Sequence, residues 1–356
     1  MKFKLHKYVE PDFSKLNNIQ MAKYIQAPQD GVAPDYFHAT SIYPEFYNIK
    51  GEWLLPNHSR MDCVAILRDN NSIDIVEFRN IKKNDKVIIG RTEDGSEGIF
   101  LHIGCFIDNK SKKDIFGFRH SRTRETSFSK DYDNLYGVLK HDMEHGHIVW
   151  VLGPAVVFDH DSREAFVKLI QKGYVDGLLA GNALATHDME GDMFKTALGQ
   201  DIYTQEHMEN GHYNHLDLIN SVRKSGSIKK HSENSQTGIM KACVDNNVPY
   251  ILAGSIRDDG PLPDVYGDCY IAQDAMREQL KKATCVICLA TQLHTIASGN
   301  MTPAYTIKEG VIRPVYIYSV DITEFAVNKL KDRGSLSVTT IVTNVQDFLS
   351  HVENNV

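Results

Sequence analysis

Residues 148–182 read IVWVLGPAVVFDHDSREAFVKLIQKGYVDGLLAGN, and this stretch decides the fold. It opens on a near-continuous apolar run, residues 148–157, which predicts a buried strand. Residues 162–172 then place Phe166, Leu169 and Ile170 on one stripe of a helix, and a second apolar strand is expected over residues 177–180. Two apolar strands separated by a helix predict a parallel pair within an α/β sheet.

The same alternation continues to the C-terminus, so we expect residues 136–356 to form a Rossmann-like parallel sheet covered by helices on both faces. Residues 1–110 differ, because short strand-like runs alternate there with turn signals, which predicts a small β-rich domain. The polar segment 111–135 is expected to link the two. The later elements are predicted as strands at 250–253, 285–290 and 315–320 and helices at 189–198, 213–225, 236–246, 323–332 and 345–354.

Composition narrows the class of protein. A chain of 356 residues favours two domains, and a net charge of −7 without a dense basic block argues against a nucleic-acid partner. The apolar runs are shorter than the roughly 20 residues of a membrane span, and no secretory signal is visible, so we expect a soluble cytoplasmic protein without a membrane partner. Cys285 and Cys288 form a CxxC pattern inside an apolar run, where alternation along a strand predicts core thiols on opposite faces.

Glycine and small polar residues follow each predicted strand of the second domain. Ligands of parallel sheets bind beyond the carboxyl ends of the strands, and glycine lets the backbone approach them closely. The loops therefore predict a nucleotide site, although the dinucleotide fingerprint GxGxxG is absent from the chain. The candidate residues for contacts with the cofactor are Gly153, Pro154, Ala155, Gly181, Asn182, Ala183, Gly254, Ser255, Thr291, His294, Asn300 and Asp321.

Charged residues near these loops are candidates for catalysis. Arg257, Asp258 and Asp259 suit a zwitterionic substrate, with arginine for a carboxylate and aspartate for an ammonium group or as general base; a solvated turn is the alternative. His187 and Asp188 suit an acid/base pair or a helix cap. Asp321 suits either a ribose diol or a helix N-cap.

Two groups of histidines have the residue types of metal sites, but no metal is expected. Residues 141–145 match the HxxEH pattern of some zinc proteases, but a solvated helix face explains them better. His207, His212 and His215 lie in a stretch rich in glycine and asparagine that predicts a loop and a helix start.

Longer blocks of the sequence resemble the archaeal-type ornithine cyclodeaminase family, also called LOR/SDH-like, which is related to the cyclodeaminase module of cyanobacterial arginine dihydrolase fusions. The resemblance covers roughly residues 25 to 350. The blocks that carry it include VLGPAVVFDH, GYVDGLLAGNALATHDME, ILAGSIRDDGPLPDV, LATQLHTIASGNM, VDITEFAVNKLKDRGS and, upstream, APQDGVAPDYFHATSIYPEFYNIKGEW and NHSRMDC.

The resemblance implies a deoxyhypusine-synthase-like variant of the Rossmann fold that binds NAD and converts L-ornithine to L-proline and ammonia. It also implies that Asn57, Arg60 and Asp62 contact the substrate, with Arg60 or Arg257 holding its carboxylate. A homo-oligomer is expected. The alternatives are an oxidoreductase of the opine type acting on another amino acid or imine, and an NAD-binding module without turnover.

Overall fold

The computed structural model describes residues 3–107, 129–258, 260–324, 326 and 338–356, and the chain divides into two compact units. The α/β unit comprises residues 1–3, 126–299 and 316–356, and the β-rich unit comprises residues 4–125 and 300–315. Two boundaries differ from the sequence-based prediction. Residues 300–315, assigned to the catalytic domain, join the β-rich unit as a hairpin, and helix α1 (Ser129–His145) begins inside the predicted linker, of which residues 111–128 lie outside the described part.

The α/β unit is built on seven parallel strands in the order β15-β14-β11-β10-β16-β19-β20. This confirms the predicted fold class. The central strands β10 (Ile148–Leu152) and β16 (Cys285–Leu289) are buried at every position, as expected for a sheet covered on both faces. The other strands are β11 (Gly177–Gly181), β14 (Tyr250–Ala253), β15 (Val265–Tyr266), β19 (Tyr316–Asp321) and β20 (Val338–Val342).

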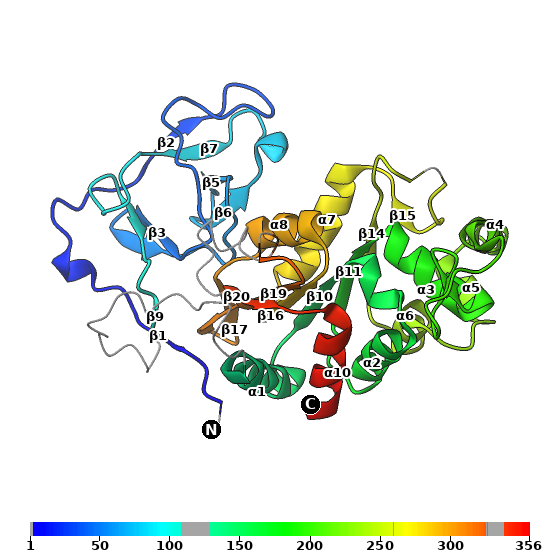
Figure 1. Ribbon diagram of the computed structural model, residues 1–356. Coiled ribbons are helices and arrows are strands. Elements are labelled where there is room, and N and C mark those ends of the chain that lie inside the picture. Colours follow the sequence, from blue (N-terminus) through cyan, green and yellow to red (C-terminus); the bar gives the residue numbers. More distant parts are fainter. Residues whose placement is uncertain (1–2, 108–128, 259, 325, 327–337) are drawn as a thin grey trace. The chain divides into compact units, whose positions relative to one another are not determined.

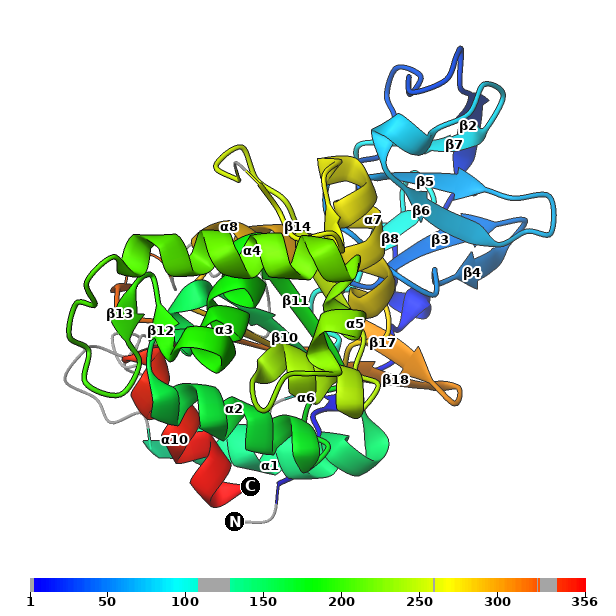
Figure 2. The same ribbon diagram turned by 90° about the vertical axis from the view of Figure 1, so that its right-hand side faces the viewer.

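Helices cover both faces of this sheet (Figures 1 and 2). Helices α1, α2 (His160–Gln171) and α10 (Val345–Asn355) lie together on one side, and α7 (Cys269–Leu280) lies on the other. The remaining helical elements are η4 (Pro154–Val157), α3 (Asn182–Phe194), η5 (Gly211–Tyr213), α4 (Asn214–Ser225), α5 (Ile228–Ser232), α6 (Ile239–Asp245) and α8 (Gln292–Met301); β12 (Thr196–Ala197) and β13 (Gln200–Asp201) form a small hairpin. Across the described residues, every helix is too short or too polar to span a bilayer.

Most predicted elements exist, with two corrections of extent. The strand predicted over residues 148–157 ends at Leu152, because Gly153 and Pro154 turn the chain into the short helix η4. The helix predicted over residues 189–198 begins already at Asn182. The helix predicted over residues 323–332 falls mostly outside the described residues. Cys285 and Cys288 are buried in β16, as predicted.

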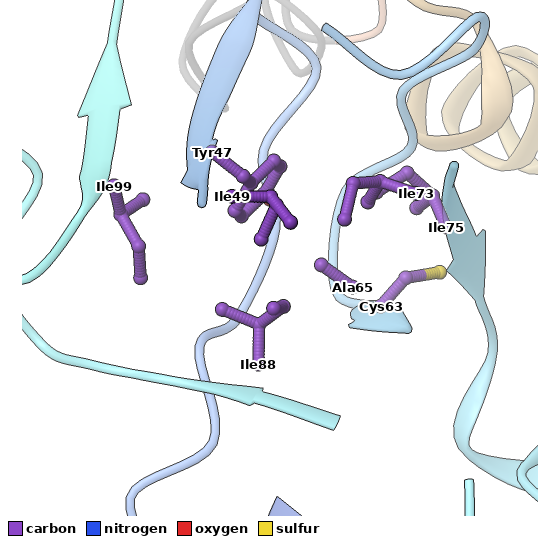
Figure 3. Close-up of a cluster of buried hydrophobic side chains, with 8 residues drawn as sticks. All are labelled: Tyr47, Ile49, Cys63, Ala65, Ile73, Ile75, Ile88 and Ile99. Atoms are coloured by element: carbon purple, nitrogen blue, oxygen red, sulfur yellow. The ribbon is translucent and has the colours of Figure 1, made fainter. Parts of the chain in front are cut away.

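The β-rich unit contains a four-stranded antiparallel sheet, β2-β7-β5-β6, and a three-stranded one, β4-β3-β8. Tyr47 and Ile99 from the second sheet pack with Ala65, Ile75 and Ile88 from the first, and Figure 3 shows these side chains converging on one core. The elements are β1 (Lys7–Tyr8), η1 (Phe13–Lys15), β2 (Lys23–Gln26), β3 (Glu45–Ile49), β4 (Glu52–Leu54), β5 (Val64–Leu67), β6 (Ile73–Val76), η2 (Phe78–Asn80), β7 (Lys86–Ile89), β8 (Ile99–Leu101), β9 (Phe106–Ile107), β17 (Tyr305–Lys308) and β18 (Val311–Pro314).

A buried ion pair joins three helices of the α/β unit. Arg163 on α2 donates from Nε to Oδ1 of Asp188 on α3 at 2.7 Å, and both side chains are almost fully buried. The same carboxylate accepts the amides of Ile239 and Met240 at 2.9 and 2.7 Å, so it also caps the start of α6. Asp188 therefore holds the layer of helices that α2, α3 and α6 form.

Replacing Asp188 by alanine is expected to lower the free energy of unfolding of the α/β unit by about 3–5 kcal/mol, because Arg163 is left buried without its partner. Urea denaturation followed by the fluorescence of buried Trp150, with Trp53→Phe as background, measures this change. Asp245→Ala is the control, since it removes the partly exposed Lys241–Asp245 pair on α6 and is expected to cost only about 0.3–0.5 kcal/mol. A loss below about 1 kcal/mol in the Asp188 variant would contradict the assignment.

In the β-rich unit, two glycines with positive φ make a matched pair. Gly98 (φ +78°) has no room for a side chain, because a Cβ atom there would overlap the backbone of Ala22, whereas a Cβ on Gly51 (φ +93°) would meet open space. Gly51→Ala is expected to lower the free energy of unfolding by about 1–2 kcal/mol, through backbone strain alone. Gly98→Ala is expected to lower it further, because the new Cβ atom also overlaps the backbone of Ala22. Hydrogen exchange of the amides of β5 and β7 measures both changes. Equal losses would show that the close approach to Ala22 is unimportant.

Candidate active site

The strand order locates a crevice in the α/β unit. The chain starts its parallel sheet with β10, adds β11, β14 and β15 on one side, and then adds β16, β19 and β20 on the other. The order therefore reverses between β10 and β16. In open α/β sheets, ligands bind outside the carboxyl ends of the strands at such a reversal.

At this reversal the backbones approach each other without a side chain between them. The amide of Gly153, just after β10, donates to the carbonyl of Leu289 in β16 at 2.8 Å. A Cβ atom on Gly153 would overlap the backbone of Ala290 and lie 3.2 Å from Cβ of Thr291. Only glycine fits at position 153. Gly153 and Thr291, both predicted to contact the cofactor, therefore lie next to each other.

The next strand end continues the crevice. A Cβ atom on Gly181, the last residue of β11, would lie 3.2 Å from Cε1 of His294 and 3.6 Å from the carbonyl oxygen of Ala253, the last residue of β14. His294 on α8 therefore reaches past the end of β10 to β11. Burial lowers the pKa of its imidazole below the ordinary range, so that the ring is neutral at physiological pH.

The loop that follows β14 carries the charged candidates and is anchored by hydrogen bonds from outside the loop. The side-chain oxygen of Asn182 accepts the amide of Leu262 at 3.0 Å, and Arg223 donates from Nε and an Nη to the carbonyl of Pro261. Within the loop, Oδ2 of Asp258 accepts the amide of Ser255 at 2.8 Å. Arg257 is exposed, and its guanidinium has no partner among the described residues. Asp259 lies outside the described part of the chain.

Two more predicted cofactor residues have local partners. Oδ1 of Asp321, at the end of β19, accepts the amide and hydroxyl of Thr323 at 3.0 and 3.2 Å, which holds the turn after the strand. The carbonyl of Ala155 accepts Nε2 of Gln346 at 2.8 Å. The second carboxylate oxygen of Asp321 remains available for a ligand. Pro154 opens η4, Ala183 lies in the first turn of α3, and Gly254 follows β14.

The expected pair of His187 and Asp188 is not formed. Nδ1 of His187 lies 2.8 Å from Oε2 of Glu190, one helical turn further along α3, whereas Asp188 binds Arg163 and α6. Consecutive residues of a helix point in different directions, whereas residues three apart are neighbours. Glu190 is fully buried and also accepts the hydroxyl of Thr196 at 2.8 Å, so His187 belongs to a local network.

The predicted substrate residues lie in the β-rich unit. Asn57 and Asp62 are exposed, and the buried guanidinium of Arg60 forms an ion pair with Glu77. Asn300, predicted to contact the cofactor, also clusters with this unit, where its carbonyl accepts the amide of Met61 at 3.3 Å. The structure thus brings Asn300 close to the segment 57–62.

Sequence reasoning missed three residues that position the site: Arg163, Glu190 and Arg223. Glu190 had a visible signal, because it follows His187 by three residues on a predicted helix. Arg163 and Arg223 bond to partners 25 and 38 residues away, and no local pattern announces such contacts.

Comparisons with known proteins agree with this architecture. A family model of the C-terminal Rossmann-fold domain of ArgZ-like arginine dihydrolases matches residues 136–352. The chain is 37% identical over 348 residues to the ornithine cyclodeaminase of Methanocaldococcus jannaschii, which covers 94% of this chain and 78% of that protein. It is 34% identical to the bifunctional arginine dihydrolase/ornithine cyclodeaminase AgrE of Nostoc, over 92% of this chain and 46% of AgrE.

Solved structures extend the likeness to three dimensions. The crystal structure of a conserved LOR/SDH protein from Methanococcus maripaludis matches with a TM-score of 0.85 and 34% identity, over 95% of this chain and 98% of that one. AgrE in a ternary complex with ornithine and NAD⁺ matches with a TM-score of 0.58 and 34% identity, over 95% of this chain and 46% of that one. The protein therefore belongs to the archaeal-type ornithine cyclodeaminase family, enzymes that share a Rossmann-fold domain with cyanobacterial ArgZ and AgrE.

Proposed function

We propose that the protein is an NAD-dependent ornithine cyclodeaminase that converts L-ornithine to L-proline and ammonia. The observation that carries the proposal is the reversal of strand order between β10 and β16, where sheets of this kind bind ligands and where Gly153 packs against the backbone of Ala290 with no side chain between them. The relative AgrE, crystallised with ornithine and NAD⁺, supports both ligands.

The residues at the crevice fit a dinucleotide. Gly153 and Gly181 offer close backbone approach, and Asn182 and Asp321 offer polar atoms beside them. We assign the cofactor to the strand ends and helix starts that contain Gly153–Ala155, Gly181–Ala183, Gly254–Ser255, Thr291 and His294, together with Asp321, and keep Asn300 as a prediction. When bound, NAD supplies a reversible acceptor for two electrons from the substrate's α-carbon.

The charged loop after β14 suits the substrate. Arg257 matches the α-carboxylate, because a guanidinium binds a carboxylate with two parallel hydrogen bonds. Asp258 has one oxygen bonded to Ser255, and its second oxygen can accept a hydrogen bond from a substrate ammonium group. Ornithine carries one carboxylate and two ammonium groups, so both residues have a counterpart on it.

Incubation with ornithine and a small fraction of one equivalent of NAD tests the reaction. We expect many molecules of proline and ammonia per molecule of NAD, without accumulation of NADH, because electrons taken from the α-carbon return to the ring product. Product is measured by mass spectrometry and NADH by absorbance. NADH formed in proportion to substrate would instead favour an opine-type oxidoreductase, and NAD binding without product from basic amino acids or cyclic imines would favour a module without turnover.

Two substitutions separate cofactor binding from substrate binding. Asp321→Ala is expected to weaken NAD binding about 5- to 30-fold, in line with about 1–2 kcal/mol for one hydrogen-bonded carboxylate. Asp258→Asn is expected to leave NAD affinity unchanged and to lower kcat/KM for ornithine. Calorimetric titration with NAD and steady-state kinetics measure the two effects. The opposite pattern, with NAD binding lost in the Asp258 variant only, would reverse the two assignments.

A further inference from the structure

We propose that His294 is the proton acceptor of this reaction: its imidazole takes the proton that the α-ammonium group loses when the α-carbon is oxidised and returns it when the ring is reduced. This inference rests on the proposed function and adds a residue role to it. It goes beyond the cofactor contact that the sequence suggested for His294.

The position of the ring is the first argument. His294 is the third residue of α8, which follows β16, and its Cε1 atom lies against Gly181 at the end of β11. In the sheet, β10 lies between β16 and β11. The imidazole therefore crosses the carboxyl end of the strand at which the order reverses, where a ligand of such a sheet binds.

The state of the ring is the second argument. Neither ring nitrogen of His294 has a hydrogen-bond partner within the described part of the chain, and no charged group contributes to its pKa shift, which is due to burial alone. The lowered pKa keeps the imidazole unprotonated near pH 7, and an unprotonated imidazole has one nitrogen that accepts a proton. The ring can therefore accept a proton from a substrate bound in the crevice.

The other titratable residues near the crevice are already engaged. Asp188 binds Arg163 and the start of α6, and Nδ1 of His187 binds Glu190. Asp258 and Asp321 each have an oxygen bonded within their own loops.

The proton balance of the reaction calls for one such acceptor. Oxidation removes one hydride and one proton from the α-carbon and its ammonium group and leaves an iminium. The δ-ammonium group and this iminium then form the new C–N bond and break the old one, giving a cyclic iminium and ammonium with all protons conserved. Reduction of the cyclic iminium consumes one hydride and one proton. A single group that stores one proton therefore completes the cycle.

The first test uses His294→Ala and His294→Gln. We expect kcat to fall about 10²- to 10⁴-fold, the usual contribution of a positioned acid or base, while the dissociation constant of ornithine stays within about threefold of the wild type. Free imidazole is expected to restore part of the activity of His294→Ala and to leave the Gln variant unchanged. His231→Gln is the matched control, because burial also lowers the pKa of His231 on α5, and it should keep the wild-type kcat.

The second test uses the contact between Gly181 and His294. A Cβ atom on Gly181 would press on the ring, so Gly181→Ala should lower kcat, and the loss in the double variant with His294→Ala should be smaller than the product of the two single losses, since the ring is gone. Gly177→Ala, in the same strand, would place its Cβ 3.3 Å from the side-chain oxygen of Gln279 and 3.7 Å from Cγ2 of Val149, and should leave kcat unchanged.

A third measurement does not depend on turnover. Diethyl pyrocarbonate acylates unprotonated imidazoles, so His294 should be modified in the protein alone and protected by NAD plus ornithine, whereas His231 should be modified equally in both, as read by peptide mass spectrometry. Unchanged kcat in the His294 variants, absence of imidazole rescue, additive effects of the two substitutions, or unprotected His294 would each overturn the inference. A wild-type protein that binds NAD but forms no proline would refute the proposed function itself, and this result is distinct from all of them.

Discussion

The contact between Gly153 and the backbone of Ala290 is the constraint on which the rest of the active site depends. Parallel strands β10 and β16 are neighbours, and at their carboxyl ends the two chains come so close that no Cβ atom fits between them. Because the strand order reverses at this point, helices leave the sheet in opposite directions and open a crevice. Glycine is therefore required by packing at the place proposed for the cofactor, so the strand end presents bare backbone there although the chain lacks the GxGxxG pattern.

Two buried carboxylates of α3, Asp188 and Glu190, help to fix the helices beside the crevice. Asp188 is bonded to Arg163 and to two amides of α6, and Glu190 to His187 and Thr196. Both carboxylates project from α3, the helix that begins at the crevice, so they tie it to α2, α6 and the β12–β13 hairpin. An unpaired charge in these positions would cost several kcal/mol, so the network specifies one arrangement of the helices.

Sequence patterns predicted the sheet well because a strand buried on both faces must be apolar, and the predicted strands over residues 148–157, 177–180 and 285–290 each overlap an observed one. The glycines near the strand ends were also visible in the sequence, although the first strand ends at Leu152 and not at Val157 as predicted. Contacts distant in sequence were not predictable. Asn182 and Leu262 are 80 residues apart. The hairpin of β17 and β18 joins the β-rich unit, although in the sequence it stands between β16 and β19 of the α/β sheet. Pairing of His187 with Asp188 was wrong because adjacency in sequence is not adjacency on a helix.

The distribution of charge within the candidate site suggests a division of tasks. Arg257 is exposed on the loop after β14, where hydration makes a permanent charge inexpensive, and Asp258 lies beside it. His294, by contrast, is partly buried at the centre of the sheet edge and neutral. An iminium is destroyed by water, so a partly buried imidazole beside it avoids the hydration shell that a carboxylate would bring. In the proposed mechanism, charged groups at the rim select the zwitterionic substrate, and the imidazole within the crevice takes up and returns its proton.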